Sequence, residues 1–180
     1  MRTRSLFVLA LLALAALTPA DDSNVDSIYT DLAEPPCDVV FEDDETGSVT
    51  LRCEGPEDYA LLLHDGDARM SVTVVTPDGQ EHDLNYWSVV TRAFSALGPK
   101  AEWRFRSKEG SLLPNAIIVR VNAYEDPENP DKITSYLAVA KIDDSGICVT
   151  DRVPPVAEQN VRARELADAS AGKPCLPELP

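Results

Sequence analysis

The side chains best suited to chemistry in this chain are its two histidines, its four cysteines and its acidic clusters. His64 is followed by Asp65, and His82 lies between Glu81 and Asp83. A histidine beside a carboxylate is a candidate general base, because imidazole titrates near neutrality. No nucleophile elbow, phosphate-binding loop or zinc-protease helix accompanies either histidine. We therefore interpret both histidines as exposed turn residues, and we expect no catalytic residues and no enzymatic activity.

The four cysteines are expected to form two disulfides. Cys37, Cys53, Cys148 and Cys175 are even in number, too widely spaced for a zinc site, and contain no C-x-x-C pair. Four cysteines allow three pairings. We favour Cys37 with Cys53 and Cys148 with Cys175, because each bond then ties a terminal segment to the nearest strand.

Three acidic clusters raise the question of calcium binding: residues 42–45, Asp65 with Asp67, and residues 125–131. Calcium takes six to eight oxygen ligands from a wrapped loop, and none of these clusters has the order of an EF-hand. We interpret them as solvated turns, and we expect no metal and no cofactor.

A second charged group consists of arginines that alternate with apolar residues. Arg104, Arg106 and Arg120 fall on the polar sides of predicted strands. Gathered on one sheet face, they could select a carboxylate or a phosphate. The preferred interpretation is pairing with Glu102 and neighbouring acids.

The segment 101–142 predicts three consecutive antiparallel strands, around which the rest of the chain is arranged. Trp103 and Phe105 alternate with charged residues, so both rings are predicted to lie in the core. The run 133–142 is apolar on both faces, as in a strand that is covered on both sides. Pro127 and Pro130 indicate a turn before it.

Two short helices are predicted beside the strands. The first runs from Trp87 to Leu97 along an apolar stripe and ends at Gly98-Pro99. The second covers residues 156–169, with Val161 and Leu166 facing the sheet. The resulting fold class is α+β: a mainly antiparallel β-sheet, curled or sandwich-like, with two short helices and two disulfides.

The order of residues at the N-terminus is typical of a secretory signal peptide. Two arginines precede an apolar run at 6–17, and small residues follow at 18–20. We divide the chain into a signal peptide (1–20), an extended N-terminal arm (21–36), a single β-rich domain (37–175) and a C-terminal tail (176–180). The protein is expected to be periplasmic or secreted in a bacterium, without stable membrane insertion once the signal is removed.

The chain is acidic, with 16 basic and 31 acidic residues and a formal net charge of −15. Such a surface repels nucleic acid and attracts basic partners. We predict an exported, non-enzymatic binding or interaction protein, and one specific version is an inhibitor of a basic cell-wall hydrolase such as lysozyme. The alternative is a small hydrolase or small-ligand carrier with a pocket near the Trp87 segment.

Tyr86 and Trp87 are the candidate partner-binding residues. Because they are adjacent, one face of a helix or strand does not readily bury both, and exposed aromatic rings often anchor interfaces. Tyr86 is predicted to be the exposed anchor, so Tyr86→Ala would weaken binding without loss of thermal stability.

A resemblance can be stated from several short motifs. They are Ser27-Ile28-Tyr29-Thr30-Asp31-Leu32 before Cys37, Gly66-Asp67-Ala68-Arg69, Leu97-Gly98 followed by Glu102-Trp103-Arg104, Ile117-Ile118-Val119-Arg120, Cys148, and Ala163-Arg164-Glu165-Leu166-Ala167. Together they are similar to small exported proteins of bacteria, particularly alphaproteobacteria, that carry no assigned activity. The resemblance implies export in a bacterium and supplies no site residues.

Overall fold

The computed structural model describes residues 27–33, 35–108 and 111–180. The predicted signal peptide (1–20) and the first part of the predicted N-terminal arm lie outside the described residues.

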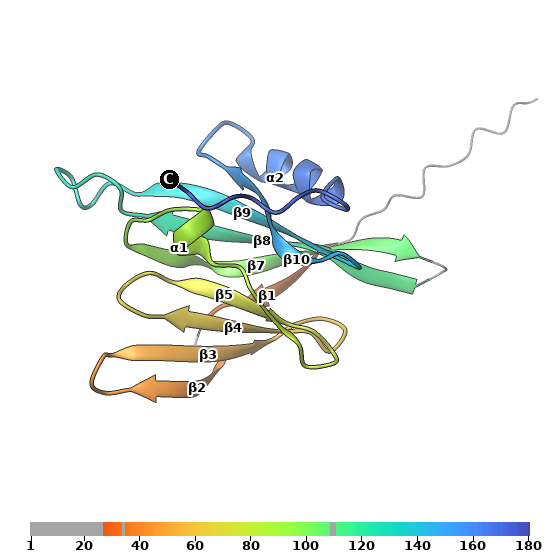
Figure 1. Cartoon of the computed structure of the whole chain (residues 1–180), viewed down its shortest axis with the longest axis horizontal. Coiled ribbons are helices and arrows are strands. Elements are labelled where there is room, and N and C mark those ends of the chain that lie inside the picture. The colour runs from red at the N-terminus through yellow and green to blue at the C-terminus, as the bar shows by residue number, and fades with distance from the viewer. Residues whose placement is uncertain (1–26, 34, 109–110) are drawn as a thin grey trace, which may run out of the picture.

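The described chain forms two five-stranded antiparallel sheets that stack on one another (Figure 1). Sheet A has the order β1-β7-β8-β9-β10, with strands β1 (Ser27–Asp31), β7 (Ser95–Lys108), β8 (Ser111–Ala123), β9 (Thr134–Asp143) and β10 (Gly146–Val153). Sheet B has the order β2-β3-β4-β5-β6, with strands β2 (Asp38–Asp43), β3 (Ser48–Glu54), β4 (Ala60–Asp65), β5 (Ser71–Val75) and β6 (Glu81–Asp83). The predicted antiparallel architecture is confirmed, and because the helices are short the fold is a mainly-β sandwich.

The main core fills the space between the two sheets. Its largest fully buried strand residues come from β4, β5, β7 and β8: Leu61, Leu63, Val72, Val74, Trp103, Ile117, Val119 and Val121. Trp103 is 0% exposed and Phe105 is 3% exposed, so their predicted core positions are confirmed. The alternation of apolar and polar residues on a pleated strand is the cause, because it directs one set of side chains to a single face.

The outer face of sheet A is covered by helix α2 (Gln159–Asp168), which forms a second, smaller core. Ala163 and Ala167 are fully buried against β8 and β9, and their small side chains let the helix lie close to the sheet. The double coverage explains why β9 is apolar on both faces. Leu166 packs on this core as predicted, whereas the prediction for Val161 is wrong: Val161 is 49% exposed, since it lies on the solvent side of the helix.

Buried charges also hold α2 on sheet A. The Arg104 guanidinium is almost fully buried and donates two parallel hydrogen bonds to the Asp168 carboxylate, each 2.9 Å long. Glu102, on the same strand, accepts hydrogen bonds from Arg164 (2.7 Å) and from the Ser27 hydroxyl (2.7 Å). The preferred interpretation of Arg104, pairing with acids of the protein itself, is therefore confirmed.

The first helix is much shorter than predicted. Helix α1 contains only Tyr86–Val89, and the chain enters β7 at Ser95, so the predicted extension to Leu97 is wrong. The β-branched residues at 89–91 lower the helix propensity of this segment, and Leu97 pairs with Val121 of β8. Pairing in the sheet thus overrides the apolar stripe.

The predicted N-terminal arm contributes a strand to sheet A. Strand β1 pairs with β7 from Ser27 to Asp31, and Leu32 after it is buried. Ile28 and Tyr29 remain about half exposed, so Leu32 is the residue of this segment that enters the main core.

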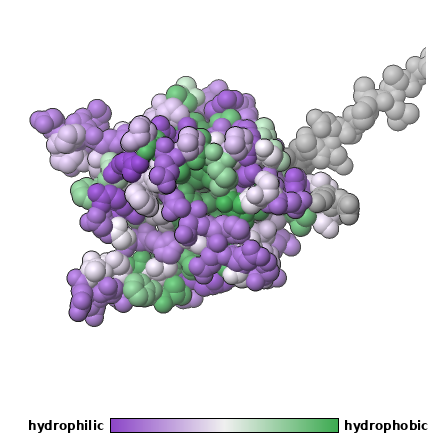
Figure 2. Space-filling model, in the orientation of Figure 1, coloured by the Kyte–Doolittle hydropathy of each residue, from purple (hydrophilic) through white to green (hydrophobic). Residues whose placement is uncertain are grey.

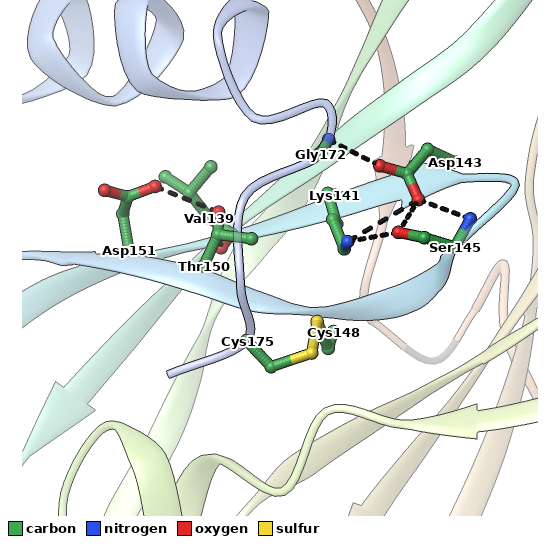
Figure 3. Close-up of a disulfide and its surroundings, with 9 residues drawn as sticks. All are labelled: Val139, Lys141, Asp143, Ser145, Cys148, Thr150, Asp151, Gly172 and Cys175. Atoms are coloured by element: carbon green, nitrogen blue, oxygen red, sulfur yellow. Dashed lines mark hydrogen bonds and ion pairs between the residues drawn. A yellow bond between two sulfur atoms is a disulfide. The ribbon is translucent and has the colours of Figure 1, made fainter. Parts of the chain in front are cut away.

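Both predicted disulfides are present. Cys37 bonds to Cys53 and ties the start of β2 to the end of β3. Cys148 bonds to Cys175 and ties the C-terminal segment to β10 (Figure 3). The reasoning that each bond holds a terminal segment to the nearest strand is confirmed.

A carboxylate near the second disulfide fixes the same C-terminal segment. Asp143, at the end of β9, accepts hydrogen bonds from the Gly172 N–H (2.9 Å) and the Ser145 N–H (2.8 Å), and lies 3.5 Å from the buried Lys141 ammonium (Figure 3). Burial alone would raise the pKa of Asp143. The hydrogen bonds and the Lys141 charge outweigh burial and lower the pKa from 3.8 to about 2.

We expect Asp143→Asn to lower the free energy of unfolding by at least about 2 kcal/mol at pH 7, because the ionised carboxylate and its pairing with Lys141 are both lost. A carboxyl group with a depressed folded pKa stabilises the fold above its unfolded pKa. This contribution should therefore disappear as the pH falls from about 4 to about 2. Urea unfolding across this pH range measures it, with Asp38→Asn on the exposed strand β2 as control. A wild-type minus variant difference that does not change with pH would contradict the assignment.

Candidate binding site

The outer face of sheet B is the part of the sandwich that the described helices leave open. Helix α2 covers sheet A, and α1 lies at one end of the sandwich near β5 and β7 (Figure 1). Polar side chains from four adjacent strands occupy this open face, among them Thr50, His64, Thr73 and Asp83. A sheet face without a covering layer can present such groups to a ligand.

These four side chains form a continuous hydrogen-bonded chain across sheet B. His64 Nδ1 lies 3.3 Å from the Thr50 hydroxyl, and His64 Nε2 lies 2.8 Å from the Thr73 hydroxyl. The Thr73 hydroxyl in turn donates to the Asp83 carboxylate at 2.5 Å. Register explains the assembly, since Thr50 pairs with His64 and Thr73 pairs with Asp83.

These hydrogen bonds determine which nitrogen of the His64 imidazole carries the proton. A hydroxyl has one proton, and that of Thr73 is donated to Asp83, so His64 Nε2 must carry the proton that Thr73 accepts. In the neutral imidazole, Nδ1 then accepts from the Thr50 hydroxyl. The two contacts thereby hold the ring in one orientation.

A hollow of about 680 Å³ lies next to these hydrogen-bonded side chains. It is lined by His64, Gly66, Asp67, Arg69, Ser71, Thr73, Asp83, Asn85, Trp87 and Arg92. The indole of Trp87 is 49% exposed, whereas Thr73 is 2% exposed. The site thus combines an accessible aromatic ring with polar groups fixed by the sheet.

The charges in the hollow are already partly engaged. Arg69 forms an ion pair with Asp67, and its guanidinium lies 4.7 Å from the centre of the Phe94 ring. Arg92 donates a hydrogen bond to the Leu179 carbonyl. Two arginines therefore face two aspartates, Asp67 and Asp83, and neither sign is in excess.

Of the two adjacent aromatic residues, Tyr86 is buried and Trp87 is exposed. The expectation that one of them stays exposed is met by Trp87, but the nomination of Tyr86 is wrong, because Tyr86 is 0% exposed. Successive residues of a helix point about 100° apart, so α1 directs Tyr86 into the main core and Trp87 outward. Burial raises the pKa of the Tyr86 hydroxyl above its usual value, and no hydrogen-bond partner for it is found among the described residues.

The histidines also lie elsewhere than predicted. His64 is a half-buried residue of β4, and not an exposed turn residue, because Leu61 and Leu63 take the inner face of that strand and leave His64 on the outer one. His82 is a half-buried residue of β6 that lines a separate hollow of about 450 Å³ with Tyr59. Thr50 and Thr73 could not be recognised from the sequence, since their contacts with His64 depend on strand register.

The acidic turns do not assemble into a metal centre within the described ranges. No group of three or more histidine, cysteine, aspartate or glutamate side chains there could hold a metal ion. In the same part of the chain, no helix is long and apolar enough to cross a membrane.

A second exposed feature is apolar and lies away from the hollow. Val39, Val40 and Phe41 of the edge strand β2 are 43%, 52% and 55% exposed, at the lower edge of the molecule in Figure 2. None of them lines the hollow beside Trp87, so Phe41 provides a matched exposed aromatic residue for control experiments.

The fold and the site together define a disulfide-linked β-sandwich with an open, polar sheet face. Comparisons with protein-family models, with curated proteins and with solved structures found no match. The resemblance to exported alphaproteobacterial proteins therefore stays a prediction.

Tyr86→Ala is expected to lower the free energy of unfolding by about 3–5 kcal/mol, because it leaves a large cavity in the core. Tyr86→Phe should cost less than about 1 kcal/mol or stabilise the fold, since it removes a buried hydroxyl that has no hydrogen-bond partner among the described residues. Chemical denaturation of both variants measures the difference. An equally large loss in both would contradict the assignment of the ring as the stabilising part.

Thr73→Val is expected to lower the free energy of unfolding by about 1–3 kcal/mol, because it removes the hydroxyl that links His64 to Asp83. Thr50→Val, which removes only the longer contact at the other end of the chain, should cost less than about 1 kcal/mol. Paired urea titrations compare the two variants. Equal costs would show that the Thr73 bridge does not hold the chain together.

Proposed function

We propose that this protein is an exported, non-enzymatic binding protein and that the hollow beside Trp87 is its binding site. The observation that carries the proposal is the half-exposed indole of Trp87 on a hollow of about 680 Å³ whose lining residues are mostly of polar type. Cavities of this size are typical of small-ligand sites. Exposed tryptophans are strongly enriched among the residues that dominate binding energy.

The contrast between the two tryptophans supports the proposal. Trp103 is fully buried, and its indole N–H donates to the Thr30 hydroxyl at 2.9 Å. Trp103 thus contributes to stability through packing. Trp87 leaves half of its surface in water, which forgoes part of the hydrophobic stabilisation that a buried ring would contribute. A binding role accounts for a large apolar side chain in that position.

The geometry of His64 favours binding over hydrolysis. In a nucleophile–histidine–acid triad, the carboxylate bonds directly to the imidazole and orients it. Here Thr73 stands between His64 and Asp83, and Thr50 is a weak, half-buried candidate for a nucleophile. These hydrogen bonds therefore fix polar side chains on the sheet surface and do not activate a nucleophile.

Export is part of the proposal. The N-terminal sequence is typical of a signal peptide, and the two disulfides are typical of chains that fold outside the reducing cytoplasm. We place the protein in the periplasm of a bacterium or in its secretions.

A basic protein partner remains the competing occupant. The net charge of −15 would accelerate the approach of a cationic protein such as lysozyme. The lining of the hollow itself, with two arginines and two aspartates, adds no preference for a cation. The acidic surface thus favours encounter with such a partner but does not by itself select it.

Tryptophan fluorescence tests the site. Trp87 is exposed and Trp103 is buried, so a ligand in the hollow should change the red-shifted part of the emission in a saturable way. The titrants are lysozyme and a soluble extract of bacterial envelope, and lysozyme activity is measured in parallel. We expect the response to disappear in Trp87→Phe and to persist in Phe41→Ala.

Two results would count against the proposal. One is the absence of any saturable change with every titrant, and the other is an unchanged response in Trp87→Phe. Inhibition of lysozyme that Trp87→Phe leaves intact would place the binding surface elsewhere.

A further inference from the structure

We infer that the hollow beside Trp87 takes an uncharged glycan. The inference rests on the proposed function and names the chemical class of the ligand at the same site. Three features of the hollow carry it: the indole, the balance of donors and acceptors, and the balance of charge.

The indole supplies a stacking surface. The face of an aromatic ring is electron-rich, and the axial C–H groups of a pyranose form a flat, weakly positive patch of similar size. About half of the Trp87 side chain is accessible, so a sugar ring can lie against it while the other half stays packed on the protein. A purely apolar ligand would instead leave the surrounding polar groups without partners.

The polar groups around the indole offer both donors and acceptors. Asp83 Oδ1 accepts from Thr73, and no hydrogen bond within the described residues reaches Asp83 Oδ2, which leaves it as an acceptor. The exposed Asn85 amide can both donate and accept. The Ser71 oxygen accepts the Tyr86 N–H, and the Ser71 hydroxyl proton can still be donated. Sugar hydroxyls also donate and accept, so they match such a mixed lining.

The charge balance argues against ions as ligands. An anion drawn to Arg92 would also face Asp83 and the paired Asp67, and a cation drawn to Asp83 would face Arg69 and Arg92. A neutral ligand avoids both repulsions and can still accept hydrogen bonds from arginine and donate them to aspartate. The hollow therefore favours a neutral ligand, although the net charge of the whole chain alone would predict a basic partner.

The site is also organised before the ligand arrives. Asp83 and His64 are held by Thr73, which is almost fully buried. Fixed side chains lose little conformational entropy on binding, which favours affinity for a weakly interacting ligand.

The test is a fluorescence and calorimetric titration of the purified protein with three kinds of probe. The neutral probes are chitooligosaccharides and maltooligosaccharides, the anionic probe is oligogalacturonate, and the cationic probes are lysozyme and a lysine-rich peptide. We expect at least one neutral probe to quench Trp87 saturably, with an affinity that changes less than about twofold between low and high salt, as binding without net charge pairing requires.

Two variants locate the interaction. Trp87→Ala and Asn85→Gly should each weaken neutral-glycan binding, the first by about tenfold or more through loss of the stacking surface. Glycine is chosen at position 85 because Asn85 has a left-handed backbone conformation (φ 46°) that glycine adopts without strain. Phe41→Ala should bind as the wild type does. Circular dichroism and urea unfolding check that both site variants fold, which is expected because Trp87 and Asn85 are exposed.

The outcomes separate the inference from the proposed function. Saturable binding of only the anionic or only the cationic probes, lost in Trp87→Ala, overturns the glycan inference and supports the proposed binding site. Neutral-glycan binding that Trp87→Ala leaves unchanged overturns the inference as well. If no glycan binds, the glycan inference is wrong. If the envelope extract also leaves the fluorescence of Trp87 unchanged, the proposed function is wrong as well.

Discussion

The packing of the two sheets around Trp103 is the interaction on which the rest of this structure depends. The ring is fully buried, its N–H is satisfied by Thr30 of β1, and its ring centre lies 5.7 Å from that of Tyr59. A Cβ at Gly55 would come within 2.8 Å of the indole, so only glycine permits the chain to pass that close. One side chain of β7 thus fixes the N-terminal strand, the β3–β4 turn and the distance between the sheets.

Once the sheets are packed, their outer faces differ in a way that assigns their roles. Sheet A is covered by α2, so charges on its outer face are removed from water, and Arg104 must be matched by Asp168 and Glu102. An unmatched buried charge would cost several kcal/mol. No described helix covers sheet B, so its outer polar groups need only partial pairing.

The sequence predicted what depends on local periodicity and missed what depends on pairing between strands. Alternation around Trp103 predicted the strands and the core, and the positions of the cysteines predicted both disulfides. Tyr86 and Trp87 could be separated only by the rotation of a single helical turn, which adjacent residues do not reveal. His64 became part of a site only because the β3–β4 and β4–β5 registers bring Thr50 and Thr73 within hydrogen-bonding distance of it. No spacing in the linear sequence records those registers.

The position of Trp87 finally depends on the far end of the chain. The Leu179 N–H donates to the Ser88 carbonyl of α1 at 2.7 Å, and Arg92 donates to the Leu179 carbonyl. The Leu176 N–H in turn donates a hydrogen bond to the carbonyl of Val149 in β10, next to the disulfide at Cys148. The C-terminal tail therefore clamps the one-turn helix that turns Trp87 outward, although a helix of this length has little stability of its own. In this arrangement, a disulfide on sheet A helps to hold the aromatic residue of the proposed site on sheet B.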